Sequence, residues 1–482
     1  MMAALTWVHR WLGVALCLMF ATWFASGIVM HFVPFPSLTE AERIAGLAAI
    51  NVTRVTHGPA DAVAASGIAD VTRVRLIQRS DGPVYVVGGR SGVVALRAAD
   101  LSRATVASPV LALAIAIAHA QQRGLRVSAA GAVQVADRDQ WTVAGDLDRH
   151  RPLYRVALND DAGTELYVSS ATGEVIRDTT HYERWWNALG SIPHWLYVTA
   201  LRGRPQLWTA LLWTFSLAGT IAALAGSVLG IGRISRQGRV GSPYHGWHAW
   251  HHLGGLICMT FVLTWMFSGF LSMDDGRLFP GAQLTDPEAA ILTVAPPAES
   301  WPRDAPQSVS SSAKELEWFG FNGRIYRRDR LGVDRQRLAP VNTDRQVAVE
   351  ALDLGPSEIT ALAQRLGPQC TVAVVDPRAD AYAIAASMPD APVYRVACGD
   401  VWFHIDGASG AVIERLDGPR RAYRWLYRAL HTLDIPVLMA HPALRSALIV
   451  VLCGCGLAFS LTGCVIAWRR LGASLRTAGN DG

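Results

Sequence analysis

Four long apolar windows set the strongest limit on what this chain can fold into. They run from Trp11 to Met30, from Leu207 to Ile231, from Leu253 to Met273 and from Ala443 to Trp468. At about 1.5 Å of rise per residue, a helix over each window is long enough to cross a hydrocarbon core of roughly 30 Å. A hydrophobic content of 51% with only 17% charged residues agrees with this interpretation. We therefore expect a membrane protein with four transmembrane helices.

Arginine residues predict the orientation of these helices. Lys314 is the single lysine of the chain, so arginine supplies nearly all of the positive charge. Arginines precede the first window, fill the short loop between the second and third, and follow the fourth: Arg10, Arg233, Arg236, Arg239, Arg469, Arg470 and Arg476. By the positive-inside rule, the short loop and both termini face the cytoplasm, and the two long segments are exported. The first window, without a clear cleavage site, is expected to be a retained signal anchor.

These signals divide the chain into eight segments. We expect transmembrane helices at 5–33, 206–232, 248–273 and 442–469, a cytoplasmic loop at 233–247, a cytoplasmic tail at 470–482, and exported domains at 34–205 and 274–441. Alternating runs such as YRVAL and ELYVSS predict that the exported domains are α+β modules with antiparallel strands. The runs GPVYVVGGRSGVVAL and NGRIYRRDRLGVDRQ predict further modules of the same kind.

An internal repeat relates the first window to the third. At a constant offset of 242 residues, HRWLGVALCLMFATWFASG from His9 matches HHLGGLICMTFVLTWMFSG from His251. In the exported segments, YRVALNDDAGTELYVSSATGEV from Tyr154 runs parallel to YRVACGDVWFHIDGASGAV from Tyr394. We therefore expect a four-transmembrane-helix bundle made of two parallel repeats, each consisting of a span, an exported domain and a second span.

Several motifs resemble those of PepSY-associated transmembrane proteins. They are VHRWLG at Val8, TELYVSSATGEV at Thr164, YHGWHAWHHLGG at Tyr244, TWMFSGFLSMD at Thr264 and ALHTLDIP at Ala429. The resemblance covers almost the whole chain and implies PepSY-like periplasmic domains on a bacterial inner-membrane protein. Some members of the family are described as haem-containing reductases of ferric siderophores. PepSY modules are also associated with the inhibition of peptidases.

Histidines at the ends of the spans are the candidate haem ligands. His9 and His31 are 22 residues apart, so on a helix they lie within roughly 40° of one face and about 33 Å apart along the axis. Gly13 and Gly27 lie one turn inside them, which leaves room for a flat macrocycle. Inward-facing histidines in a four-helix bundle are a known way to build a cofactor site. We therefore expect two haem sites, one near each membrane face.

The repeat assigns ligands to both sites. We predict His9 and His251 for the inner haem, and His31 with either His431 or His194 for the outer haem. Two further candidates remain open: Met273, which occupies the symmetry position of His31 and offers a thioether, and His252, which competes with its neighbour His251.

Other metal chemistry has little support in the sequence. His248 and His252 have the spacing of a metal pair, but no carboxylate or third ligand is near. The pair Cys453 and Cys455 inside an apolar window is typical of helix packing. We predict no metal site apart from the haem iron. Outside the windows, Cys370 and Cys398 are compatible with a disulfide in an oxidising compartment or with two buried thiols.

The expected function is electron transfer across the membrane by two haem b groups to a periplasmic acceptor. Ferric iron or a ferric siderophore is the expected acceptor, which makes the chain a candidate haem-dependent ferric reductase. No dinucleotide or nucleotide fingerprint is present, so electrons would come from a quinol or a separate reductase. Membrane lipid is the other expected partner, and no basic tract indicates nucleic acid. The alternative is a non-enzymatic PepSY-domain anchor that binds or regulates a periplasmic peptidase or sensor.

Overall fold

The chain folds into two compact units, each built from segments that are distant in the sequence. The computed structural model describes residues 2–127, 131–237, 241–274, 276–306, 310–341, 352–377, 379–383 and 391–480. One unit, the helical unit, comprises Met1–Phe35, Trp185–Gly281 and Pro419–Gly482. The other, the sheet unit, comprises Pro36–Arg184 and Ala282–Gly418. Arg239 of the expected short loop lies outside the described residues, as do the side chains of Arg236 and Arg476.

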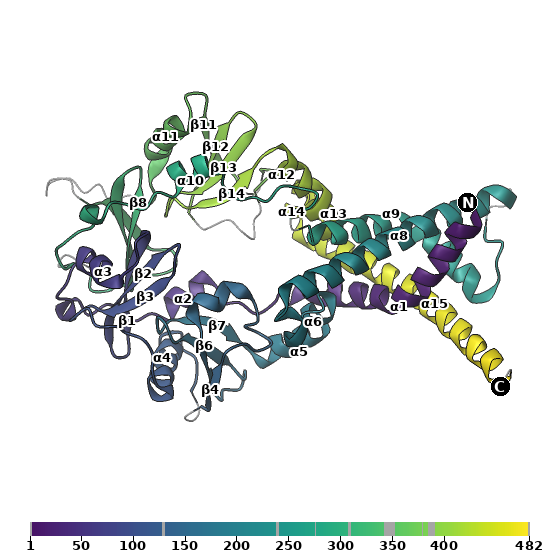
Figure 1. Cartoon of the computed structure of the whole chain (residues 1–482), viewed down its shortest axis with the longest axis horizontal. Coiled ribbons are helices and arrows are strands. Elements are labelled where there is room, and N and C mark those ends of the chain that lie inside the picture. Colours follow the sequence, from purple (N-terminus) through teal and green to yellow (C-terminus); the bar gives the residue numbers. More distant parts are fainter. Residues whose placement is uncertain are drawn as a thin grey trace. The chain divides into compact units, whose positions relative to one another are not determined.

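Four helices of the helical unit are long and apolar enough to cross a membrane. They are α1 (Met2–Phe32), α8 (Pro205–Gln237), α9 (Gly246–Ser272) and α15 (Pro442–Asn480). Helix α1 packs against α8 and α15, and α9 packs against the same two helices (Figure 1). The four helices therefore form a bundle in which α1 and α9 lie diagonally opposite each other.

Proline and glycine explain where these helices begin and how closely they pack. Pro205 and Pro442 are the first residues of α8 and α15, where the fixed φ angle suits a helix and the missing N–H leaves no bond unmade. Gly456 of α15 packs on Phe24 of α1, and a Cβ added to it would lie 2.6 Å from the phenyl ring. Small residues of this kind allow membrane helices to approach each other closely.

Short helices adjoin the bundle. Helix α6 packs on α1, while η5 and α13 pack on α9. These short elements are α5 (His181–Leu189), which begins in the sheet unit, α6 (Ser191–His194), α7 (Thr199–Arg202), α12 (Gly418–Tyr423), η5 (Arg424–Ala429), α13 (Leu430–Thr432) and α14 (Pro436–Met439). Exposed aromatic side chains on α5, such as Trp185 and Trp186, are typical of the boundary between a membrane and water.

A six-stranded antiparallel sheet is the centre of the sheet unit and joins the two halves of the chain. Its strand order is β10-β9-β8-β1-β2-β3. The strands are β1 (Val71–Arg79), β2 (Gly82–Gly89), β3 (Val93–Arg97), β8 (Glu315–Phe321), β9 (Arg324–Arg330) and β10 (Gln336–Pro340). Strands β1 and β8 pair directly, with Leu76 opposite Leu316. The two exported segments predicted from the sequence therefore share one sheet.

Two four-stranded antiparallel sheets, each covered by a helix, complete the sheet unit. The first has the order β4-β5-β6-β7 and packs on α4, and the second has the order β11-β12-β13-β14 and packs on α11. The first set is β4 (Val133–Ala136), β5 (Leu153–Ala157), β6 (Glu165–Ser169), β7 (Val175–Thr179) and α4 (Pro109–Gln122). The second set is β11 (Thr371–Val375), β12 (Val393–Cys398), β13 (Val401–Asp406), β14 (Val412–Leu416) and α11 (Gly355–Leu366).

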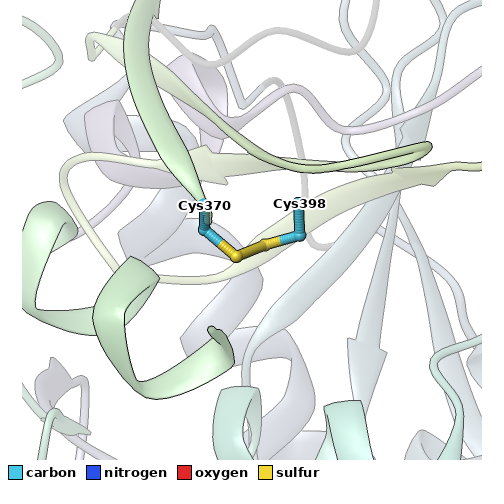
Figure 2. The surroundings of a disulfide bond; sticks show 2 residues. All are labelled: Cys370 and Cys398. Atoms are coloured by element: carbon cyan, nitrogen blue, oxygen red, sulfur yellow. A yellow bond between two sulfur atoms is a disulfide. The ribbon is translucent and has the colours of Figure 1, made fainter. Parts of the chain in front are cut away.

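Short helical turns connect these sheets. They are α2 (Glu40–Ala45), η1 (Val52–Arg54), α3 (Pro59–Ser66), η2 (Gly145–His150), α10 (Asp286–Leu292) and η3 (Ala298–Ser300). A disulfide joins Cys370, just before β11, to Cys398 at the end of β12 (Figure 2). Of the two alternatives left open by the sequence, the structure thus has the disulfide.

A buried ionic network connects the first four-stranded sheet to the central sheet. Glu315 of β8 is fully buried and accepts hydrogen bonds of 2.8 and 3.0 Å from Arg43. Arg75 of β1 lies between Glu315 and Glu174, with its closest bond, 2.6 Å, to Glu174. Burial opposes ionisation of Glu315, but the neighbouring guanidinium groups outweigh it and hold the pKa of this carboxyl well below its usual range.

Candidate cofactor site

His9 and His251 meet across the bundle and form what we call the first histidine pair. Their ring centres are 6.3 Å apart and their planes are inclined by 38°. Nδ1 of His9 lies 2.9 Å from the backbone oxygen of Ala222 on α8, and Nδ1 of His251 lies 2.9 Å from the hydroxyl of Thr462 on α15. Two helices thus supply the imidazoles, and the other two orient them.

The partners of this pair determine which ring nitrogen carries the proton. A backbone carbonyl only accepts, so Nδ1 of His9 is the donor. The hydroxyl of Thr462 donates to the carbonyl of Phe459 and therefore accepts from Nδ1 of His251. In both rings Nε2 keeps its lone pair, and it makes no hydrogen bond to any described residue. An imidazole held at one nitrogen and free at the other is the usual state of a metal-binding histidine.

An apolar cavity opens beside the first histidine pair. Its volume is about 540 Å³, and residues of all four long helices line it. Gly226 of α8 lies against the ring of His9, where an added Cβ would be 2.5 Å from Cε1. Gly13 faces open space in the same cavity. The volume is in the range of sites that hold small molecules and cofactors.

His194 and His431 form the second histidine pair. They lie on the short helices α6 and α13, and their ring centres are 6.4 Å apart with an interplanar angle of 69°. Nδ1 of His194 is 2.9 Å from the hydroxyl of Ser26, and Nδ1 of His431 is 3.1 Å from the hydroxyl of Ser268. Each serine hydroxyl also donates to a carbonyl of its own helix. The imidazoles are therefore the donors at Nδ1, as in the first pair.

The second pair is oriented by its surroundings and is uncharged. Trp23 donates from its indole nitrogen to the carbonyl of His194 at 2.9 Å. Burial, with a smaller contribution from the neighbouring His431, lowers the pKa of His194 to about 3. Burial also lowers the pKa of His431 to about 4. Both rings are thus neutral near pH 7, which is the state that binds a metal. Each ring also makes a hydrogen bond to a backbone carbonyl, that of Trp23 for His194 and that of Trp265 for His431.

His31 and Met273 lie apart from the two pairs. Nε2 of His31 is 2.8 Å from the hydroxyl of Ser446 on α15, so this nitrogen already has a partner. Met273 directly follows α9, and its backbone N–H donates to the carbonyls of Phe270 and Leu271. Within the described residues its side chain makes no hydrogen bond to an imidazole. The structure therefore brings His194, rather than His31, next to His431.

His252 is buried and fully hydrogen-bonded. Its Nδ1 lies 3.0 Å from the hydroxyl of Ser242, and its Nε2 lies 3.1 Å from the backbone oxygen of Gly230. With both nitrogens occupied, this ring has no free lone pair to offer, unlike its neighbour His251. His252 lines the cavity and holds the loop before α9 against α8.

The separation within each pair fits two imidazoles on one metal ion. A metal–imidazole bond is about 2 Å long and a ring nitrogen lies about 1 Å from its ring centre, so two rings on opposite sides of one ion have centres about 6 Å apart. The observed separations are 6.3 and 6.4 Å. Among the described residues no group of three or more His, Cys, Asp or Glu side chains could hold a bare ion. Two protein ligands are sufficient only where a macrocycle supplies the others, as in haem.

Sequence reasoning missed the role of two serines. Ser26 and Ser268 each lie 17 residues after a histidine of the first pair and are equivalent in the repeat, but the repeat alone indicates no role for them. Their burial in otherwise apolar helices is the signal that points to a polar partner. They lie about 25 Å along the helices from the first pair, so the two pairs lie at different levels.

Four apolar helices, with paired histidines at two levels of the bundle that they form, define a multi-pass membrane protein. The family model described as "PepSY-associated TM region" matches residues 6–470, and the chain belongs to this family. The match confirms the resemblance seen in the sequence motifs. No curated protein and no solved structure matches the chain significantly.

Proposed function

We propose that the protein binds two b-type haems, one at each histidine pair, and passes electrons across the membrane to a periplasmic acceptor. One observation carries the proposal. All four imidazoles donate from Nδ1 and stand in pairs whose ring centres are 6.3 and 6.4 Å apart, and in the first pair Nε2 has no partner among the described residues. Packing alone requires none of these features, whereas paired histidines that would hold a haem usually show them.

The residues around the pairs have distinct tasks in this proposal. Haem, when bound, supplies one-electron chemistry between the ferric and ferrous states. The carbonyl of Ala222 and the hydroxyls of Thr462, Ser26 and Ser268 orient the imidazoles and make them more basic ligands. The glycines beside the rings keep space open for a flat group.

Aromatic side chains fill the bundle between the two levels. The ring of Phe24 on α1 lies 5.9 Å from Trp265 on α9, and Trp265 lies 5.7 Å from Phe261. Phe24 and Trp265 belong to the apolar core of the bundle, and Phe261 packs against it. Electrons moving between the two levels would therefore cross an apolar and aromatic interior.

The arginine distribution supports an orientation with the first pair near the cytoplasm and the second near the periplasm. In this orientation, electrons would move from the first pair to the second. The sequence has no nicotinamide or flavin motif, so we propose a quinol or a separate reductase as the donor. Ferric iron in a chelate, such as a siderophore, is the acceptor that the family resemblance favours.

The optical spectrum of the purified protein tests the proposal directly. We expect a Soret band that shifts on reduction, sharp alpha absorption, and two haems per chain by pyridine haemochrome assay. In membranes that contain the reduced protein, the haem should be reoxidised when a ferric chelate is added. A colourless but folded protein would contradict the haem proposal and favour the membrane-anchor alternative.

Alanine variants of the first pair locate one of the haems. We expect His9→Ala and His251→Ala each to remove one haem, approximately halving the total, if the two levels bind independently. His245→Ala is the matched control, because His245 is the exposed residue that precedes α9 and does not line the cavity. Full haem content in both pair variants would remove the first pair as a haem site.

A further inference from the structure

Three arginines line the cavity beside the first histidine pair, and they come from three different helices. They are Arg10 of α1, Arg233 of α8 and Arg470 of α15. We infer that these guanidinium groups bind the two propionate carboxylates of the haem held by His9 and His251. The inference rests on the proposed function, because it names the part of the cofactor that this end of the cavity recognises.

The ionisable side chains that line the cavity include arginines but no carboxylate. No aspartate or glutamate lines the cavity, and the four long helices contain none. Arg10 and Arg233 form no ion pair with any described residue, whereas Arg470 lies over the ring of Trp11 at 5.5 Å. Three cations around one cavity repel each other, and a ligand that brings negative charge relieves this repulsion.

Arg233 and Arg470 have matching positions on their helices relative to the first histidine pair. Gly226 lies against His9, and Gly463 lies against His251 with an added Cβ 3.4 Å from Cε1. Arg233 and Arg470 each follow these glycines by seven residues, which is about two turns on nearly the same helix face. Both guanidinium groups therefore lie beyond the imidazoles, toward the same end of the bundle. Carboxylates at the edge of a macrocycle held by the pair would point toward them.

Guanidinium groups are well suited to bind carboxylates. A guanidinium offers a planar fork of donors that matches a carboxylate, and such bonds are stronger than those between neutral groups. Arg10 and Arg470 remain exposed while they line the cavity, so their aliphatic stems can cover apolar surface and their charged ends can reach its mouth. The phosphate of a lipid headgroup has similar charge, and the experiment must separate these two sources.

Haem b and its dimethyl ester, which lacks free carboxylates, provide the test. Both are titrated into the full-length His194→Ala protein from haem-depleted cells, so that only the first pair binds. We expect the free acid to bind at least about tenfold more tightly than the diester, since one arginine–carboxylate bond contributes on the order of 1.5 kcal/mol. Arg10→Gln and Arg233→Gln should reduce this preference. Arg469→Gln should keep it, because Arg469 is exposed beside Trp247 and outside the cavity lining.

The midpoint potential gives a second measurement in the folded holoprotein. A nearby cation favours the more electron-rich ferrous state, so Arg10→Gln and Arg233→Gln should lower the potential of this haem, while Arg469→Gln should not. Equal binding of acid and diester, with haem retained, would overturn the inference and leave the proposed function standing. An unchanged preference with loss of co-purified anionic lipid would assign the arginines to lipid. Failure of the parent protein to bind haem would instead reject the proposed function.

Discussion

At the level of single residues, two serine hydroxyls orient the second histidine pair. Ser26 and Ser268 lie in the middle of apolar surroundings, and each is fully buried or nearly so. A buried hydroxyl needs a hydrogen-bond partner, and each serine has two, a carbonyl of its own helix and an imidazole. The second pair is therefore as firmly positioned as the first, although its histidines lie on short helices.

This arrangement predicts different effects for two histidines at the same end of the bundle. We expect His194→Ala to remove the haem of the second pair, leaving about half of the total. His31→Ala should retain it, because Nε2 of His31 is already bonded to Ser446. Haem content per chain after affinity purification is the measurement. Loss in His31→Ala with retention in His194→Ala would restore the symmetry-based assignment of His31.

The two pairs differ in how far sequence could predict them. His9 and His251 lie inside long helices, where a fixed rise and rotation convert sequence spacing into position. His194 and His431 lie on helices of four and three residues, and the direction of such short pieces depends on the loops around them. Sequence could therefore predict the first pair, but only name candidates for the second.

At the level of elements, the disulfide fixes the pairing of β11 with β12. Cys370 and Cys398 lie directly next to the paired residues Thr371 and Ala397 at the open end of this hairpin. A long connection separates the two strands, and the bond closes a loop with a sequence separation of 28 residues. The crosslink therefore limits the conformations that this segment can adopt when the sheet unit unfolds.

Removing the crosslink should destabilise the sheet unit. For a loop of this length, the chain-entropy model gives about 3–4 kcal/mol for Cys370→Ser with Cys398→Ser. We expect a lower midpoint of thermal unfolding and faster hydrogen exchange in β11 and β12. Cys455→Ser, which removes an exposed free thiol of α15, should change neither. Unaltered exchange in β11 and β12 of the double variant would show that the hairpin does not depend on the crosslink.

At the level of the whole molecule, sequence predicted the parts but not how they join. The four spans were predictable because apolar length alone distinguishes a membrane helix. The runs that became β2 and β9 were predicted as separate modules, yet both belong to one sheet. Strand pairing across 240 residues, as between Leu76 and Leu316, depends on tertiary contacts, and the alternation of apolar residues carries no information about the partner.

Three arginines surround Glu315, so a substitution of this residue tests whether the buried ionic network stabilises the sheet unit, to which both halves of the chain contribute. We expect Glu315→Gln to destabilise the sheet unit by about 3–5 kcal/mol, since it leaves Arg43, Arg75 and Arg330 without their shared carboxylate. The control Asp61→Asn, in an exposed pair with His57, should cost at most about 1 kcal/mol. Chemical denaturation is the measurement, and equal costs for the two variants would contradict a central role for this network.

The pH dependence of stability has the same origin. The pKa of Glu315 is depressed in the folded protein, so its contribution is complete above the ordinary pKa of a glutamate and is lost as the pH falls toward the folded-state value.

The pairing of β1 with β8 also has a consequence for biosynthesis. The residues that pair are separated by 240 positions, and a ribosome adding about 5–20 residues per second needs roughly 10 to 50 s to make that stretch. During this time β1 presents an open strand edge, with unpaired backbone groups that invite wrong partners. The edge of β1 stays unpaired until β8, in the second half of the chain, has been synthesised. Two separately translated halves would carry complementary edges and could assemble into the same sheet.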